Sequence, residues 1–157
     1  MIRFSALHQT AQPNYVGTSG DKVVKYDAVE YNEGLAYNPL TGVFTAPYSG
    51  TYLFSASIRL VGIASSNPHY AYYLDVDAGL GQHYYYRFVE GNPYNQQHGG
   101  SLNISGSIAI LMEEGEKVSV KITANGGTSN NISLASDTAN YFTGIALTPP
   151  PPPEVEE

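Results

Sequence analysis

The stretch YNPLTGVFTAPYSGTYLFSASI, residues 37–58, decides the fold. Thr-Gly, Ala-Pro and Ser-Gly pairs, which are turn signals, separate runs in which aromatic and small residues alternate. Successive side chains of a strand point to opposite faces, so Tyr52 and Phe54 fall on the same face. No charged residue interrupts the stretch before Arg59. The stretch therefore predicts short strands joined by tight turns, with the aromatic side chains packed into a core.

The same pattern extends toward both ends of the chain and predicts one all-β domain. Short runs of alternating apolar and polar residues recur along the sequence, separated by Gly, Pro and Asn turn signals. No window of about eleven residues sustains the apolar spacing that an amphipathic helix requires. A chain of 157 residues is the right length for a single core. We therefore expect a sandwich or barrel over residues 1–148.

The segment PPPPPEVEE, residues 149–157, is expected to lie outside this domain. Proline has no backbone N–H, so five consecutive prolines cannot join a sheet and favour the extended polyproline II conformation. An acidic end follows the prolines. The segment is typical of a tether or spacer.

Composition and charge exclude several classes of function. Charged residues make up only 13% of the chain, the net charge is −7, and the seven Lys and Arg residues are scattered. Because phosphate binding needs clustered basic residues, a nucleic-acid partner is not expected. The absence of cysteine excludes disulfides, thiolate nucleophiles and Cys-ligated zinc. No apolar run reaches the length of a signal peptide or a membrane span, so membrane insertion is not expected.

The opening stretch, extended back to residue 26, resembles the signature of the C1q globular-head family, within the C1q and tumour-necrosis-factor jelly-roll superfamily. The aromatic, Asn and Gly positions of that signature are held by Tyr26, Asn32, Tyr37, Phe44, Gly50, Tyr52 and Phe54. Tyr26 stands where Phe is usual, and Ala56 stands where a last aromatic is expected. RFSAL, SGSIAILMEEGEKVSVKI and YFTGIAL resemble further family segments in the same order, so the resemblance spans residues 3–147.

The resemblance implies an all-β jelly-roll β-sandwich of about ten strands. It also implies a homotrimer, because family members assemble around an axis lined by aromatic and apolar residues. Fourteen tyrosines are consistent with such interfaces. A trimer would present three copies of every loop at one end, which converts weak single-site binding into avidity.

Asp75 and Asp77 are the candidate metal ligands. They lie at i and i+2 in the predicted strand YAYYLDVDAG, on the face expected to be solvated, and two carboxylates there could share a hard cation such as calcium. Some relatives of this family bind calcium near the trimer axis. The alternative is an ordinary solvated strand face. No catalytic residues are proposed, since the four histidines are isolated from any triad-like arrangement in the sequence.

The most unusual local composition lies in HYAYY and HYYYRF. Tyrosine and histidine stack on sugar rings, and tyrosine-rich surfaces also anchor protein partners. We therefore predict that Tyr85, Arg87, Tyr94 and Gln96 bind a ligand. The alternative is that the tyrosines of these segments line the subunit interface or the core, with Tyr72, Tyr84 and Tyr86 as the candidates.

Two non-enzymatic functions follow. The first is a secreted, extracellular homotrimer that recognises carbohydrate or protein ligands through loops at one end. The second is a structural trimer on a virus or bacterial surface, such as a capsid decoration protein or a fibre head. The absence of a recognisable leader, the absence of cysteine and the Pro-rich acidic tail favour the second function.

Overall fold

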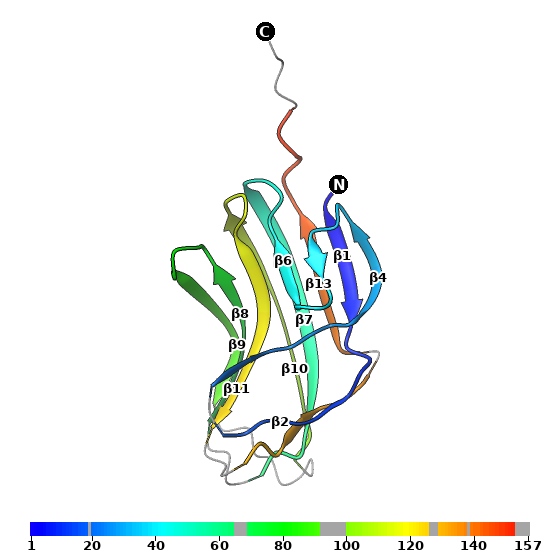
Figure 1. Cartoon of the computed structure of the whole chain (residues 1–157), viewed down its shortest axis with the longest axis vertical. Coiled ribbons are helices and arrows are strands. Elements are labelled where there is room, and N and C mark those ends of the chain that lie inside the picture. Colours follow the sequence, from blue (N-terminus) through cyan, green and yellow to red (C-terminus); the bar gives the residue numbers. More distant parts are fainter. Residues whose placement is uncertain (19, 65–68, 92–99, 126–128, 138, 153–157) are drawn as a thin grey trace.

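The computed structural model describes residues 1–18, 20–64, 69–91, 100–125, 129–137 and 139–152. Within these residues the chain forms thirteen strands and no helix, arranged as two facing antiparallel sheets (Figure 1). The predicted all-β jelly roll is confirmed. No described segment is a helix long and apolar enough to cross a membrane.

The first sheet has the strand order β2-β12-β7-β13-β1-β4, and β10 pairs with the free side of β7. Its strands are β1 (Arg3–Leu7), β2 (Gln12–Val16), β4 (Ala28–Glu33), β7 (Gly50–Val61), β10 (Leu102–Met112), β12 (Ile132–Leu134) and β13 (Tyr141–Ala146). The longest pairing joins all eleven residues of β10 to β7. Residues 50–58 therefore form most of β7, which pairs with β10, β12 and β13.

The second sheet has the order β5-β6-β11-β8-β9, with β3 paired to β11. Its strands are β3 (Asp21–Val23), β5 (Tyr37–Asn38), β6 (Val43–Thr45), β8 (His69–Asp77), β9 (His83–Gly91) and β11 (Lys117–Asn125). Strand β9 is one edge of this sheet. A register shift between Tyr72 and Tyr73 marks an irregularity in its pairing with β8.

Aromatic rings fill the space between the sheets, as the period-two pattern predicted. The rings of Phe4 and Tyr37 stack at 4.6 Å, and Phe44 packs edge-on against Phe54 at 5.2 Å. Gly144 makes room for this cluster, because a Cβ there would lie 2.4 Å from the Phe4 ring. The signature aromatics are thus packing residues.

The segment around Tyr26 does not form one continuous strand. Strand β3 joins the second sheet and β4 joins the first, and residues 24–27 cross between them. Tyr26 lies in this crossing and is fully buried. Its hydroxyl donates to the Ser57 carbonyl oxygen at 3.0 Å and shares a 2.6 Å hydrogen bond with the Tyr72 hydroxyl. Burying a tyrosine with partners for its hydroxyl favours the crossing over a continuous strand.

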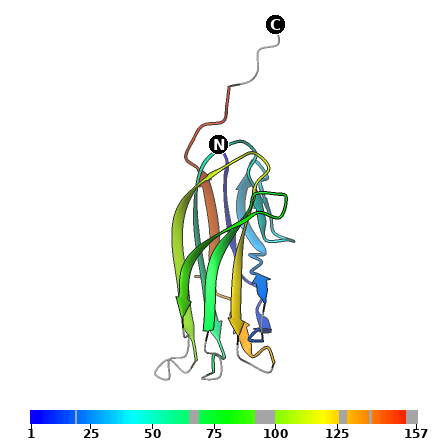
Figure 2. The same cartoon turned by 90° about the vertical axis from the view of Figure 1, so that its left-hand side faces the viewer.

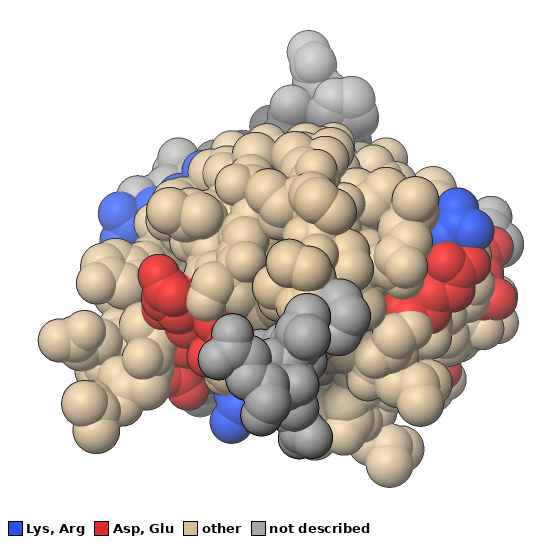
Figure 3. Space-filling model, turned by 90° about the horizontal axis from the view of Figure 1, so that it is seen from above, with Lys and Arg blue, Asp and Glu red and all other residues tan. Residues whose placement is uncertain are grey.

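The N-terminus and the C-terminal end of β13 lie at the same end of the sandwich (Figure 1). Thr148 is held there, because its carbonyl accepts from the Tyr48 hydroxyl at 3.0 Å and its Oγ1 accepts from the Thr51 N–H at 3.2 Å. Beyond it, the exposed prolines 149–152 lead away from the sheets (Figure 2). Seen from this end, most of the visible surface is uncharged and acidic side chains gather in separate groups (Figure 3).

Candidate ligand-binding face

The outer side of the second sheet carries a three-by-three array of mostly polar side chains, which we call the β8 face. It is built from alternate residues of β11, β8 and β9, placed side by side by the strand register. Its three rows are Lys121, Tyr73 and Arg87; Ser119, Asp75 and Tyr85; and Lys117, Asp77 and His83. Because paired residues on neighbouring strands lie on the same side of a sheet, one surface collects all nine.

Asp75 occupies the centre of the β8 face and is only 3% exposed. Its Oδ1 accepts a hydrogen bond from His83 Nδ1 at 2.8 Å, and its Oδ2 lies 2.5 Å from Lys121 Nζ. The expectation that this face of β8 is freely solvated is therefore wrong at Asp75. The side chains of the neighbouring strands cover the carboxylate, which the sequence of β8 alone does not reveal.

Tyr73 is also buried, although it points to the outer side of the sheet. Burial raises the pKa of its hydroxyl, and a hydrogen bond with Asp21 of β3, which pairs with β11, raises it further. Its ring meets the ring of Tyr85 edge-on at 5.5 Å. Tyr73 thus supports Tyr85 from below and offers little surface of its own.

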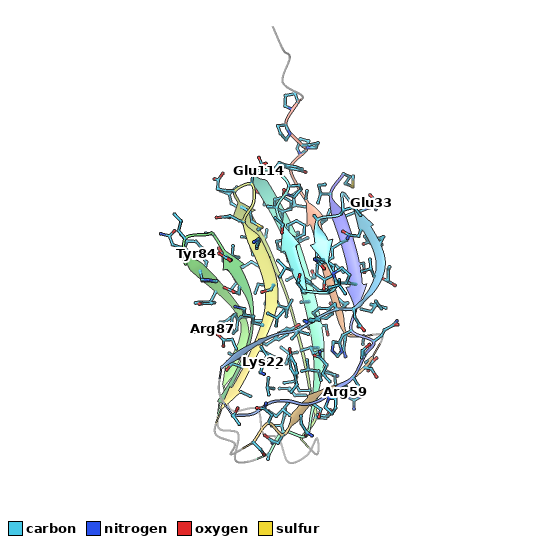
Figure 4. The ribbon with its side chains drawn as sticks, in the orientation of Figure 1. Lys22, Glu33, Arg59, Tyr84, Arg87 and Glu114 are labelled. Atoms are coloured by element: carbon cyan, nitrogen blue, oxygen red, sulfur yellow. The ribbon has the colours of Figure 1, made fainter. Side chains whose placement is uncertain are left out.

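Tyr85 and Arg87, two of the predicted ligand-binding residues, lie next to each other on this face. The Tyr85 side chain is 53% exposed, and its ring lies nearly parallel to the His83 ring at 6.2 Å. Arg87 is exposed on the outside of β9 (Figure 4). The other two predicted residues, Tyr94 and Gln96, lie outside the described residues.

The proposed calcium ligands are engaged by the protein itself. Both oxygens of Asp75 have partners, and Asp77 Oδ1 accepts from the Gly79 N–H at 2.8 Å in the β8–β9 turn. The described residues contain no group of three or more His, Cys, Asp or Glu side chains that could hold a metal ion. Calcium prefers six to eight oxygen ligands. Calcium at Asp75 and Asp77 stays a prediction, and it requires Lys121 to move.

Lys117 and Lys121 are further functional candidates, which the sequence analysis did not predict. The alternation in KVSVKI, residues 117–122, was the available signal, because it places Lys117, Ser119 and Lys121 on one face. Lys117 also lines an open groove of about 580 Å³ beside the β8 face, together with Leu35, Val43, Thr45 and Pro47. The face and the groove therefore meet at Lys117.

A second surface feature runs along the edge of the sandwich, where β9 and β10 end their sheets. Strand β10 pairs with β7 and with no other described strand, and its sequence LNISGSIAILM has no charge. Leu111 is 75% exposed on it and Tyr84 of β9 is 54% exposed. Of the tyrosines considered for a core or interface role, Tyr72 is in the core and Tyr86 packs against it.

Comparisons with known proteins agree with this architecture. A family model described as the C1q domain matches residues 3–147. The globular domain of zebrafish complement 1qA protein superposes with a TM-score of 0.66 at 17% identity, covering 94% of this chain and 97% of that chain. Murine APRIL superposes with a TM-score of 0.64 at 10% identity, over 93% and 98% of the two chains.

The Eiger TNF from S. frugiperda gives a TM-score of 0.55 at 14% identity, with 99% of this chain and 98% of that chain covered. At such identities the solved structures show a shared fold, and the family model carries the assignment. The match extends from the first residue of β1 to just beyond the end of β13. The chain belongs to the C1q domain family.

Proposed function

We propose that this protein is a non-enzymatic, extracellular homotrimer that recognises a carbohydrate or protein ligand through its β8 face. The C1q and tumour-necrosis-factor fold is generally non-catalytic and serves in trimeric, ligand-binding modules. The observation that carries the proposal for this chain is the exposed pair Tyr85 and Arg87, set around a buried carboxylate on a flat strand surface. Rigid aromatic and Arg side chains are the residue types that dominate binding energies.

The edge strand β10 supports self-association. A long, flat strand edge without charge is a template for unwanted pairing unless another chain covers it. Its outward residues continue into an apolar stripe on the first sheet, because Ala109 pairs with Leu53 and Leu53 pairs with Ile145. In a cyclic trimer, the β9–β10 edge of one protomer would cover such a stripe on the next.

Light scattering tests the assembly. We expect about three times the 16.9 kDa chain mass at micromolar concentration. Leu111→Asp should shift the mass toward the single chain, because it places a charge on the proposed interface. Leu35→Asp is the matched control, since Leu35 is equally exposed but lies in the β4–β5 turn. A single-chain mass for the unaltered protein contradicts the proposal.

Ligand binding is tested with glycan and protein arrays probed by the full chain and by Tyr85→Ala. The proposal expects one class of ligand whose binding Tyr85→Ala abolishes while trimer mass and melting temperature persist. If changes at Tyr85 and Arg87 leave binding unaffected, the ligand does not bind at the β8 face and this part of the proposal is wrong.

A structural trimer on a virus or bacterial surface is the second candidate. The observation that favours it is the proline segment that leaves the fold from an anchored Thr148. Deletion of residues 149–157 should then abolish attachment to the particle and leave the trimer intact. Under the recognition function, the same deletion leaves ligand binding unchanged.

A further inference from the structure

The β8 face differs in charge from the rest of this acidic protein. It holds Arg87, Lys117 and Lys121, three of the seven basic residues of the chain, and two of the fourteen acidic residues. The remaining sequence carries four basic and twelve acidic residues. Asp21 adjoins the face through Tyr73, yet its carboxylate already accepts from that hydroxyl. An anionic ligand would meet less repulsion here than over the rest of the molecule.

We propose that the β8 face and the adjoining groove bind an anionic oligosaccharide whose sugar units carry carboxylates. This inference rests on the proposed recognition function and names the class of its ligand. It assigns Arg87 and Lys117 as the two anion-binding ends of the site and Tyr85 as the surface on which a sugar ring stacks.

The three cations of the face differ in exposure and in the partners that the structure gives them. Lys121 is committed to Asp75 at 2.5 Å. Lys117 is exposed and forms no ion pair or hydrogen bond with the side chains that the structure describes, so its ammonium can take an outside partner. Arg87 is exposed, and its planar guanidinium matches a carboxylate in two parallel hydrogen bonds.

The spacing of these two cations favours an oligomer over a small anion. Arg87 and Lys117 lie at opposite corners of the array, two strands and four residues apart. With about 4.8 Å between strands and about 3.4 Å per residue, the separation of their backbones is roughly 17 Å. Because strand side chains stand roughly perpendicular to the sheet, the two charged ends lie about as far apart as their backbones. In that orientation a small anion contacts one of them, whereas a chain of charged sugars spans both.

The rings of Tyr85 and His83 indicate that the carboxylates of the ligand are carried by sugar units. Their rings are nearly parallel and half-exposed, and they lie on the same side of β9 as Arg87. Asp75 accepts from Nδ1 of His83 and so holds that ring in place, leaving Nε2 to meet a hydroxyl. Asp77, which is half-buried, adds a carboxylate for a further hydroxyl. Rings that stack, with hydrogen-bonding groups beside them, suit a pyranose.

The groove continues the path beyond Lys117. Thr41, Thr45 and Asn38 bring hydroxyl and amide groups to its wall, and Leu35 and Pro47 bring apolar surface. An oligosaccharide held at Arg87 and stacked on Tyr85 would therefore pass Lys117 and enter the groove. The polar and apolar groups of the groove suit the hydroxyls and the apolar ring faces of a sugar. Flexible chains gain affinity by spanning several weak contacts of this kind.

The test uses calorimetry on the full chain with hyaluronan, polygalacturonate and oligosialic acid oligomers, and with chitin oligomers as the neutral probe. Polyglutamate serves as an acidic peptide. We expect at least one carboxylate-bearing sugar to bind at physiological salt, and chitin and polyglutamate to bind at least tenfold more weakly. Arg87→Gln and Tyr85→Ala should each weaken binding at least tenfold, and Lys117→Gln several-fold.

Matched controls separate a defined site from general attraction. Arg3→Gln removes the same charge from the other sheet, and Lys22→Gln removes it from a side chain that lies over the Tyr15 ring. Neither control should change the affinity. Equal losses in controls and test variants overturn the proposal, as does equal affinity for chitin or polyglutamate.

Failure of this inference differs from failure of the proposed function. If no carboxylate-bearing sugar binds but arrays reveal another ligand that needs Tyr85, the recognition function stands and the ligand class is wrong. If the chain has a single-chain mass and arrays reveal no ligand, both fail.

Discussion

The interior of the sandwich and the β8 face both use tyrosine, but in opposite ways. Inside, the buried hydroxyls of Tyr26 and Tyr72 share a hydrogen bond, and the Tyr26 hydroxyl also bonds the Ser57 carbonyl oxygen. On the β8 face, Tyr85 leaves half of its side chain exposed while buried Tyr73 supports its ring. The difference shows that tyrosine count alone does not identify a binding surface in this protein. A core tyrosine has its ring covered and its hydroxyl hydrogen-bonded by the protein itself, whereas a tyrosine of the face leaves part of its ring exposed to a ligand.

The largest expected effect lies in the interior. Phe54→Ala should lower the free energy of unfolding by about 3–5 kcal/mol, because it empties part of the aromatic cluster between the sheets. Denaturant unfolding at a fixed protein concentration measures the loss. Tyr85→Ala is the counterpart on the face and should cost well under half as much. Similar losses at both positions would erase the distinction between the two regions.

The centre of the β8 face comes next. Asp75→Asn should destabilise the fold by about 2 kcal/mol, because the buried amide no longer neutralises Lys121 and has only one oxygen to accept hydrogen bonds; the partial exposure of Lys121 limits the cost. The paired change Asp75→Asn with Lys121→Met should recover much of the stability. Thermal unfolding of both variants provides the measurement. An unaltered melting temperature for Asp75→Asn would mean that the carboxylate does not organise this face.

Removing a hydroxyl from the buried tyrosine pair should have a smaller effect on the free energy of unfolding, and the contribution of the pair should depend on pH. Tyr26→Phe should cost about 1–2 kcal/mol, since Tyr72 and the Ser57 carbonyl lose a partner. Burial raises the pKa of Tyr26 and of Tyr72 well above 10, the value at which tyrosine ionises when unfolded. Their contribution is therefore complete below pH 10 and is lost as the pH rises further.

Absorbance titration separates these tyrosines from the exposed ones. Tyr26 and Tyr72 should ionise only together with unfolding. Tyr84→Phe is the matched control and should leave stability unchanged. Complete ionisation of all tyrosines without loss of the fold would contradict the buried pair.

The smallest expected effect belongs to the exposed ion pair Arg3–Glu33, whose side chains are 2.7 Å apart. The hydrogen bond from Arg3 holds the pKa of Glu33 below its ordinary 4.5. A depressed pKa contributes stability above about pH 4.5 that is lost as the pH falls through the folded value. Glu33→Gln should slightly reduce the loss in the free energy of unfolding as the pH falls below about 4.5, as measured by denaturant unfolding at several pH values. Because solvent screens this exposed pair, the change should lie near the limit of detection.

Much of the fold was predictable because its signals are local. Alternation placed Tyr52 and Phe54 on one face, and the turn signals marked the ends of the strands. The crossing at Tyr26 was not predicted, because its reason is a pair of hydroxyl contacts with residues far along the chain. Local propensity carries no information about such partners.

The candidate site was predictable only in part. Tyr85 and Arg87 were chosen from composition, and the structure brings them to one surface. Asp75 was expected to face solvent, because the sequence of β8 shows alternation but not the side chains that cover it. Tyr94 and Gln96 lie outside the described residues, so their part in a site stays a prediction.

By itself, the sequence determined an all-β domain, since period-two alternation and turn residues are properties of neighbouring positions. Its match to the family model also assigned that domain to the C1q domain family. Tertiary structure alone decided which side chains surround Asp75. Lys121 and His83 reach it through the register of β11 and β9 against β8, and a shift of one residue would turn either side chain to the opposite side of the sheet. Register depends on contacts between distant segments, so the β8 face exists only in the folded chain.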